Sequence, residues 1–377
     1  MANPVSGRIK LPKLYPEGPD VPTFSPEALE QFAASVFVAA GVPAEHAAIV
    51  SRSLVDSNLC GHDSHGVIRV TQYVGFLKDG KLTKDSKFAV VTETPAMLSV
   101  DGQWGLGQVQ AFTVLEKLWE KARTLGVASG TLRRTGHIGR LGEYAEWAAA
   151  KGCALFATVN SHGSGRRVAP PGGVQGRIST NPICFGSPTP AAPLVLDFST
   201  SVCAEGKVRV AHQKGGTVPA GWIQNSKGEP TTNPADLYGD PPGTILPFGG
   251  EQTYKGFGLG LMLDALAGGL SGGDCSRPDR PMPGMANCVV FVLWNTALFG
   301  GSENFLQTVG GLSEFVRNTP LAPGVNEITL PGDPERRSKA ARRANGIPIP
   351  DGTWNPLVKL ATELNVPLPQ ESTGGAA

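Results

Sequence analysis

The 377-residue chain has no excess of charge and no long apolar run, and each shortage excludes a class of protein. Lys plus Arg total 33 and Asp plus Glu total 32, so no net field draws the chain to nucleic acid or to an anionic membrane. The first residues, "MANPVSGRIKLPKLYPEGPD", lack the apolar segment of a signal peptide. We therefore expect a soluble protein that acts on a small molecule.

Cysteine is also scarce, and its distribution bears on the cellular compartment. The six cysteines are scattered without any C-x-x-C pair, and Cys153 and Cys184 lie in apolar runs typical of buried strands. This pattern argues against a disulfide framework or a zinc site. It favours reduced thiols in a cytoplasmic protein.

Two common sequence fingerprints are missing. No G-x-G-x-x-G follows an expected strand, and G-x-x-x-x-G-K-[ST] does not occur. The glycines of "YKGFGLGLMLDALAGGL" do not have the dinucleotide-binding spacing, and they favour close packing of a helix instead. The residues alone therefore indicate an α/β protein, without the Rossmann or P-loop signature.

The order of the expected elements divides the chain into regions. Helical periodicity dominates at first, with Ser25 as helix cap and Pro26 in the first turn, and short β-like runs follow from Val127. The polar, turn-rich stretch 212–250 indicates loop with little regular structure. We expect an N-terminal arm (1–24), a helix-rich catalytic and substrate domain (25–125), a sheet-rich cofactor-binding domain (126–300), a C-terminal helical segment packing on the catalytic domain (301–370) and a disordered tail (371–377).

The segment "GHDSHGVIRVTQYVGFL", residues 61–77, combines helical periodicity with reactive side chains. A helix that begins near His65 places His65, Arg69 and Tyr73 on one face, opposite several valines. One interpretation is a solvated face, although it carries neither Lys nor Glu. The other is a substrate face, on which Arg69 binds a carboxylate, His65 exchanges a proton with Asp63 as counter-charge, and Tyr73 orients the substrate.

Two rival functions use the same segment. The spacing of His62 and His65 resembles metal ligands one turn apart, so a metal hydrolase built on these residues and Asp63 is one rival, although no third ligand follows in helical register. A non-catalytic carboxylate-binding protein is the other. We expect no metal.

Three glycine-rich or hydroxyl-rich stretches offer further candidates, each with a structural alternative. "TGHIGRLGEY" places His137 between glycines at a strand-to-helix transition, where the backbone approaches an anion or simply turns. "SHGSGRRVAPPGGVQGRISTNP" either wraps a phosphate or is a mobile loop. "LVLDFSTS" ends an apolar strand with Asp197, which either holds a ribose or caps another element.

Six segments in order resemble the type 2 malate/L-lactate dehydrogenase family: "GHDSHGVIRVTQYV", "VDGQWGLGQ", "TGHIGRLGEYAEWAA", "GRISTNPICFGSP", "PLVLDFSTSVCAEGKVRVA" and "YKGFGLGLMLDAL". The resemblance covers residues from about 25 to about 360. These NAD(P)-dependent oxidoreductases include ureidoglycolate and sulfolactate dehydrogenases. The resemblance implies an α/β fold with a mixed, largely antiparallel sheet that is not a Rossmann fold, and assembly as a homodimer or larger oligomer.

The resemblance also implies roles for individual residues. Ser64 and His65 match the family's catalytic Ser-His, with the histidine as proton donor, and Arg69, Tyr73 and Thr180 are expected at the substrate. His137 matches a histidine that is the acid/base in some members and lies beside the nicotinamide. The expected cofactor-binding set is His137, Gly139, Arg140, Asn181, Asp197, Phe198, Ser199, Thr200 and Ser201.

The implied activity is hydride transfer between NAD or NADP and a small 2-hydroxy acid or 2-oxo acid of the malate or lactate type. The alternative is NADPH-dependent reduction of a cyclic imine such as piperideine or pyrroline carboxylate. Imine-reducing members tend to have an acidic residue where this chain has Lys207, which favours the hydroxy acid. Arg166 and Arg167 would suit a 2′-phosphate, and the choice between NAD and NADP stays open.

Overall fold

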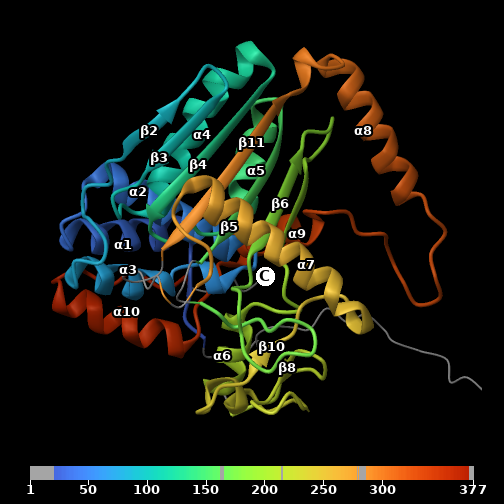
Figure 1. Ribbon diagram of the computed structural model, residues 1–377. Coiled ribbons are helices and arrows are strands. Elements are labelled where there is room, and N and C mark those ends of the chain that lie inside the picture. Colours follow the sequence, from blue (N-terminus) through green and yellow to red (C-terminus); the bar gives the residue numbers. More distant parts are fainter. Residues whose placement is uncertain (1–20, 162–164, 214, 278, 280–285, 373–377) are drawn as a thin grey trace, which may run out of the picture.

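The computed structural model describes residues 21–161, 165–213, 215–277, 279 and 286–372. The expected arm and tail therefore lie largely outside the described residues. A seven-stranded sheet runs through the molecule in the order β2-β3-β4-β11-β5-β6-β7, and every neighbouring pair is antiparallel except β3 and β4 (Figure 1). Its strands are β2 (Ala89–Glu93), β3 (Met97–Asp101), β4 (Val127–Thr135), β5 (Cys153–Asn160), β6 (Pro182–Ser187), β7 (Leu194–Ser199) and β11 (Asn287–Asn295). The predicted mixed, largely antiparallel α/β class is confirmed.

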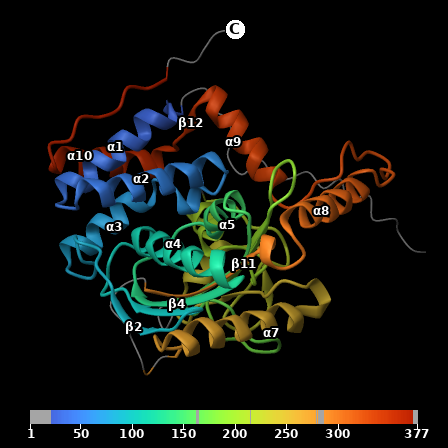
Figure 2. The ribbon, with the colours of Figure 1, turned by 90° about the horizontal axis from the view of Figure 1, so that it is seen from above.

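Helices cover both faces of this sheet. The helices α4 (Gly107–Leu125) and α5 (Leu141–Ala150) lie on one face, and α7 (Thr253–Asp264) with its π-helical extension Ala265–Leu270 lies on the other (Figure 2). Alternation along β4 and β11 places Leu132 and Phe291 inward, where they meet Leu118 and Tyr144 of the covering helices. The strands that lead into the candidate residues are therefore buried.

A second core joins helices from both ends of the chain. The helices α1 (Pro26–Ala39), α2 (Ala44–Leu59), α3 (Arg69–Lys78) and α10 (Asp351–Glu363) share one hydrophobic cluster, and β1 (Thr23–Phe24) pairs with β12 (Ile347–Pro348). Ser25 caps α1 as predicted, because its Oγ accepts from the Ala28 N–H at 3.1 Å. Helix α9 (Asp333–Asn345) lies along the end of α2.

The turn-rich region is more regular than the sequence indicates. The prediction of little regular structure over 212–250 is wrong in part, because β8 (Ile223–Gln224), β9 (Pro230–Thr231) and β10 (Thr244–Ile245) form a small antiparallel sheet. Together with α6 (Glu205–Gln213) it encloses a third hydrophobic cluster. The strands have two residues each because turns interrupt them, and such short runs leave no readable alternation.

Helix α8 (Ser302–Arg317) stands away from the body and has no buried residue (Figures 1 and 2). All six cysteines fall within the described ranges and are unpaired, and the predicted burial of Cys153 and Cys184 is confirmed. Among the described helices, none has the length and apolar character to cross a membrane.

Candidate active site

The segment 61–77 is not one helix, so that prediction is wrong. A short 3-10 helix, Asp63–His65, is followed by Gly66 with extended backbone, and α3 begins only at Arg69. A Cβ at Gly66 would overlap the side chain of Asn58, whose Oδ1 accepts the Val67 N–H at 2.8 Å. The Asn58 side chain thus fills the space that a side chain at position 66 would need. It also accepts the Val67 N–H, which would donate within the helix if the helix were continuous.

The break still brings the predicted side chains together. The Tyr73 hydroxyl lies 2.6 Å from Nδ1 of His137, and the His65 and His137 rings stack with centroids 5.3 Å apart. The Ser64 hydroxyl is hydrogen-bonded with His65 Nδ1 at 3.0 Å, and Arg69 Nε donates to the Ser64 carbonyl at 2.7 Å. We call Ser64, His65, Arg69, Tyr73 and His137 the histidine cluster. Tyr73 is only 2% exposed and His65 and Arg69 are half-buried, so these three side chains do not form a fully solvated face.

His137 reaches the cluster on a tightly fixed loop after β4. A Cβ at Gly107 would overlap the carbonyl groups of Gly136 and His137, so only glycine lets the first turn of α4 approach this loop. On the other side, the Ile138 N–H donates to Asn287 Oδ1 at 3.1 Å. The loop is therefore held by two elements distant in sequence.

Burial governs the electrostatics of the cluster. Burial, followed by the Arg69 guanidinium, lowers the pKa of His65 to about 3, and the same two causes lower the pKa of His137 well below its usual value. Burial raises the pKa of Tyr73 to about 12. Without a ligand, both imidazoles and the phenol are therefore neutral at physiological pH.

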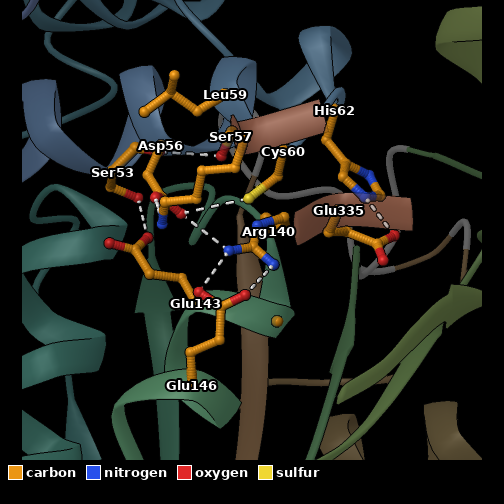
Figure 3. Close-up of polar contacts among 12 residues, drawn as sticks. Ser53, Asp56, Ser57, Leu59, Cys60, His62, Arg140, Glu143, Glu146 and Glu335 are labelled. Carbon is orange, nitrogen blue, oxygen red and sulfur yellow. Dashed lines mark hydrogen bonds and ion pairs between the residues drawn. The ribbon is translucent and has the colours of Figure 1, made fainter. Parts of the chain in front are cut away.

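Asp63 does not serve as counter-charge for His65, contrary to the sequence hypothesis. Its carboxylate accepts two hydrogen bonds from Arg342 of α9, at 2.6 and 3.0 Å, and a third from Asn58. His62 pairs instead with Glu335 of α9 at 3.2 Å (Figure 3). In the described part of the chain, no group of three or more His, Cys, Asp or Glu is placed to hold a metal ion. The metal-hydrolase rival thus gains no support.

Two expected cofactor residues are engaged in internal contacts. Arg140, 2% exposed, pairs with Asp56 at 2.8 Å and with Glu146 at 3.1 Å (Figure 3). The Asp197 carboxylate accepts the Gly142 N–H at 2.7 Å and so caps α5, which is the structural alternative that the sequence left open. Contact of either side chain with a cofactor stays a prediction.

The other expected cofactor residues lie where β6 and β7 meet α7. Thr200 Oγ1 donates to the carbonyls of Thr180 and Asn181, and Asn181 Nδ2 donates to Asp264 at 3.0 Å. Ser201 Oγ donates to the Cys203 carbonyl and to Ser199 Oγ, and Phe198 packs edge-on against Phe248. Gly139 has a positive φ of 78° in the loop beside His137. The hydroxyls stabilise the local backbone, and their cofactor contacts also stay predictions.

Two buried atoms in this region suit a nicotinamide dinucleotide. Among the described residues, Arg166 Nη1 and Asn181 Oδ1 are buried without a hydrogen-bond partner. A buried guanidinium N–H fits a phosphate oxygen, and a buried amide oxygen fits a carboxamide N–H. Arg167 instead lies over the Tyr238 ring, and Arg177 donates to Gln175. Residues 162–164 of this glycine-rich stretch lie outside the described part.

One residue of the site, Gln108, was not predicted from the sequence. Gln108, within the segment "VDGQWGLGQ", donates from Nε2 to the Tyr73 hydroxyl at 3.1 Å. It is fully buried in the first turn of α4. The available signal was a glutamine directly after a glycine pair at an expected helix start, but nothing local indicated its partner.

Comparison with known proteins identifies the class. The model of the malate/L-lactate dehydrogenase family matches residues 24–358. The L-lactate dehydrogenase of Cupriavidus necator is 37% identical over 342 residues, which cover 90% of this chain and 97% of that protein. The Δ1-pyrroline-2-carboxylate reductase of Ancylobacter novellus is 31% identical, with 86% and 93% covered. The solved malate dehydrogenase of Pyrococcus horikoshii has a TM-score of 0.83 at 30% identity, covering 92% of this chain and 96% of that one.

The fold and these matches define an oxidoreductase that differs from Rossmann dehydrogenases in lacking their parallel sheet and glycine fingerprint. The chain belongs to the malate/L-lactate dehydrogenase family, as its motifs predicted.

Proposed function

We propose that this protein is an NAD(P)-dependent dehydrogenase that transfers a hydride between the nicotinamide and a small 2-hydroxy acid or 2-oxo acid. The observation that carries the proposal is the histidine cluster, in which one guanidinium, two stacked imidazoles and a phenol converge from three separate elements. Family membership supports the reaction class. Hydride transfer to a 2-oxo acid requires these groups: a cation for the carboxylate and a proton donor for the oxygen.

Arg69 is the proposed carboxylate-binding residue. Its hydrogen bonds to the Ser64 carbonyl and, at 2.7 Å, to Gln72 Oε1 fix the guanidinium beside both histidines and involve neutral acceptors. A planar guanidinium binds a carboxylate through two parallel hydrogen bonds and so fixes the orientation of the 2-carbon. Tyr73 and Thr180 are proposed to border the substrate on either side.

His65 and His137 are the proposed proton-exchanging residues, with Ser64 orienting the His65 ring. When bound, the nicotinamide supplies or accepts the hydride. Because burial and Arg69 hold both imidazoles neutral, either can accept the hydroxyl proton during oxidation. A carboxylate bound by Arg69 offsets the repulsion from the guanidinium and makes an imidazolium less costly beside it.

For the cofactor, we propose a site lined by Gly139, Asn181 and the end of β7, with Arg166 at a phosphate. The buried unpartnered atoms of Asn181 and Arg166 support this placement. Both NAD and NADP are candidates.

A second candidate function is reduction of a cyclic imine, which the similarity to the pyrroline-carboxylate reductase favours. A cyclic imine carboxylate offers the same anion to Arg69 and a ring nitrogen, instead of an oxygen, to the proton donor. Lys207 is exposed on α6. Imine-reducing members of the family tend to have an acidic residue at this position, so Lys207 favours the hydroxy acid.

We further propose a homodimer in the cytoplasm. Large apolar side chains remain exposed on α7, its π-helical extension and α8, including Met262, Leu270 and Phe315, the last being 78% exposed. Such residues are typical of a surface that a second subunit covers. The six unpaired cysteines support a reducing compartment.

The test is absorbance at the reduced-nicotinamide band while the purified protein is offered NADH or NADPH with a panel of 2-oxo acids and cyclic imines. We expect cofactor oxidation with a 2-oxo acid. Oxidation with imines alone would support the second candidate. Silence across the panel, with calorimetry showing that neither cofactor binds, would refute both.

A further inference from the structure

We propose that Gln108 is a positioning residue that acts through the Tyr73 hydroxyl to keep the proton of His137 on Nε2, the ring nitrogen that faces away from Tyr73. The consequence for catalysis rests on the proposed dehydrogenase function. The tautomer itself can be measured without any substrate.

The geometry is a chain of three side chains, of which Gln108 and Tyr73 are buried and His137 is half-buried. Gln108 Nε2 is 3.1 Å from the Tyr73 oxygen, and that oxygen is 2.6 Å from His137 Nδ1. Gln108 lies in the first turn of α4, which approaches the His137 loop so closely that the preceding residue must be Gly107. All three groups are therefore held by backbone that has little room to move.

The inferred direction of these hydrogen bonds starts from the orientation of the Gln108 amide. In the structure Gln108 Nε2 faces the Tyr73 oxygen, and an amide N–H can only donate, so Gln108 occupies one lone pair of that oxygen. The single phenolic proton then has two possible acceptors, His137 Nδ1 at 2.6 Å and the His137 carbonyl at 3.4 Å. The proposal assigns the phenolic proton to Nδ1, the closer of the two acceptors. A neutral imidazole whose Nδ1 accepts carries its proton on Nε2.

This tautomer prepares His137 for the reduction step. The Nε2–H can donate to the oxygen of a 2-oxo acid as hydride reaches the 2-carbon. As Nε2 releases its proton to that oxygen, Nδ1 takes the proton of Tyr73, so His137 remains neutral throughout. The tyrosinate that results is hydrogen-bonded by Gln108, lies within the field of Arg69 and is reprotonated from water. Oxidation runs the same transfers in reverse and therefore starts from the state in which Tyr73 is deprotonated and His137 carries its proton on Nδ1, so that Nε2 is free to accept the hydroxyl proton.

Transfer of the proton from Tyr73 through His137, which we call the relay, also avoids a costly imidazolium. Burial and Arg69 disfavour an imidazolium at His137, so a mechanism that stores the proton there as a cation would be costly. Passing the proton through Tyr73 avoids that species. Gln108 keeps the phenol oriented so that its proton is always aimed at Nδ1.

Helix α4 supplies a matched control in Gln110. It is as completely buried as Gln108, but its Nε2 donates to the carbonyls of Lys87 and Gly102 and not to the histidine cluster. Replacing Gln110 therefore removes a buried amide from the same helix without touching the relay.

The experiment is side-chain nitrogen NMR on the full chain with 15N-labelled histidine. The His137 signals are identified by their loss in His137→Ala. The wild type should show Nε2–H at His137. In Gln108→Glu the carboxylate accepts the Tyr73 proton, so the phenol oxygen must accept from Nδ1–H, and the tautomer should switch. Gln108→Met, which removes the donor without adding charge, should give a mixture, and Gln110→Glu should resemble the wild type.

An Nδ1–H tautomer in the wild type, or the same tautomer in the wild type and both Gln108 variants, would overturn the proposal. When a 2-oxo acid is reduced, Gln108→Met should lower kcat about 10-fold and change KM less than about 3-fold, because substrate binding is retained. A tautomer switch in a protein without dehydrogenase activity would leave the positioning role intact and refute the proposed function. Normal turnover in Gln108→Met together with a switched tautomer would remove the relay from catalysis.

Discussion

Two buried polar clusters lie close together in this molecule, and they treat charge in opposite ways. In the cluster around Arg140, which we call the paired cluster, the guanidinium meets Asp56 and Glu146 (Figure 3). Asp56 also meets Lys339 of α9. In the histidine cluster, the ionisable rings are hydrogen-bonded to hydroxyl and amide groups. Neutralised charges stabilise a fold, whereas ionisable rings with displaced pKa values and uncharged hydrogen-bond partners are suited to exchange protons.

The two clusters are physically joined by the segment that carries the catalytic candidates. Helix α9 binds this segment at Asp56, His62 and Asp63, directly before Ser64 and His65. Arg342 also donates to the Asn58 carbonyl. The ionic contacts thus anchor the turn on which the neutral site is built, so the stability of one cluster supports the geometry of the other.

Removing the cation of the histidine cluster should have the largest effect. Arg69→Leu should raise KM for a 2-oxo acid and lower kcat, because the carboxylate loses both its charge partner and its orientation. We expect kcat/KM to fall about 1,000-fold, equivalent to about 4 kcal/mol of transition-state binding. Steady-state kinetics is the measurement, with the exposed Arg343→Leu of α9 as control. An unchanged kcat/KM for Arg69→Leu would remove Arg69 from the site.

Replacing each of the two stacked histidines should change the pH profile of the reaction in a different way. His65→Ala and His137→Ala are compared in the same assay over a wide pH range. The residue that exchanges the proton should lose about 300-fold in kcat together with one limb of the profile, and the other should keep both limbs. Loss of a limb in neither variant would place the proton exchange outside the cluster.

The sequence predicted much of this site because the information was local or lay in ordered motifs. Ser25, the alternation of the sheet strands and the segments containing His65 and His137 could all be identified in the chain itself. The resemblance then placed Arg69 and Tyr73 with the histidines, and the structure brings them together.

What the sequence could not show depends on partners far along the chain. The helix break at Gly66 results from an asparagine side chain that fills its space, and Arg140 is engaged by Asp56, 84 residues earlier. Gln108 acts on a tyrosine 35 residues away. Periodicity and spacing report on one element at a time, so contacts between elements escape them.

Breaking the paired cluster should lower the stability of the fold more than it lowers catalytic activity. Arg140→Met leaves Asp56 and the half-buried Glu146 without their shared guanidinium, although Lys339 still neutralises Asp56. We expect the free energy of unfolding to fall by about 3 kcal/mol. Chemical denaturation at fixed protein concentration measures this, and Lys78→Met, which removes an exposed ion pair with Glu363, should change it by about 0.5 kcal/mol or less. A loss no larger than that of Lys78→Met would mean that the paired cluster does not stabilise the fold.

Glu143 is a carboxyl group that lies beside the paired cluster but is not ion-paired with Arg140 (Figure 3). It accepts a hydrogen bond from Ser53 at 2.5 Å, and burial, followed by repulsion from Asp56, raises its pKa from 4.5 to about 7. The folded protein therefore binds this proton more tightly than the unfolded chain does. Its contribution to stability is complete below about pH 4.5 and is lost as the pH rises through about 7.

The difference in unfolding free energy between wild type and Glu143→Gln should consequently change across this pH window. The full shift corresponds to about 3 kcal/mol, which we reduce to about 2 kcal/mol because the side chain is partly exposed. Denaturation of both proteins at several pH values measures the difference, with the exposed Glu363→Gln as control. If the wild-type and Glu143→Gln curves run parallel, Glu143 is ionised in the folded protein as in the unfolded chain. The paired cluster would then stabilise a third buried carboxylate, and the contrast between the two clusters would be greater still.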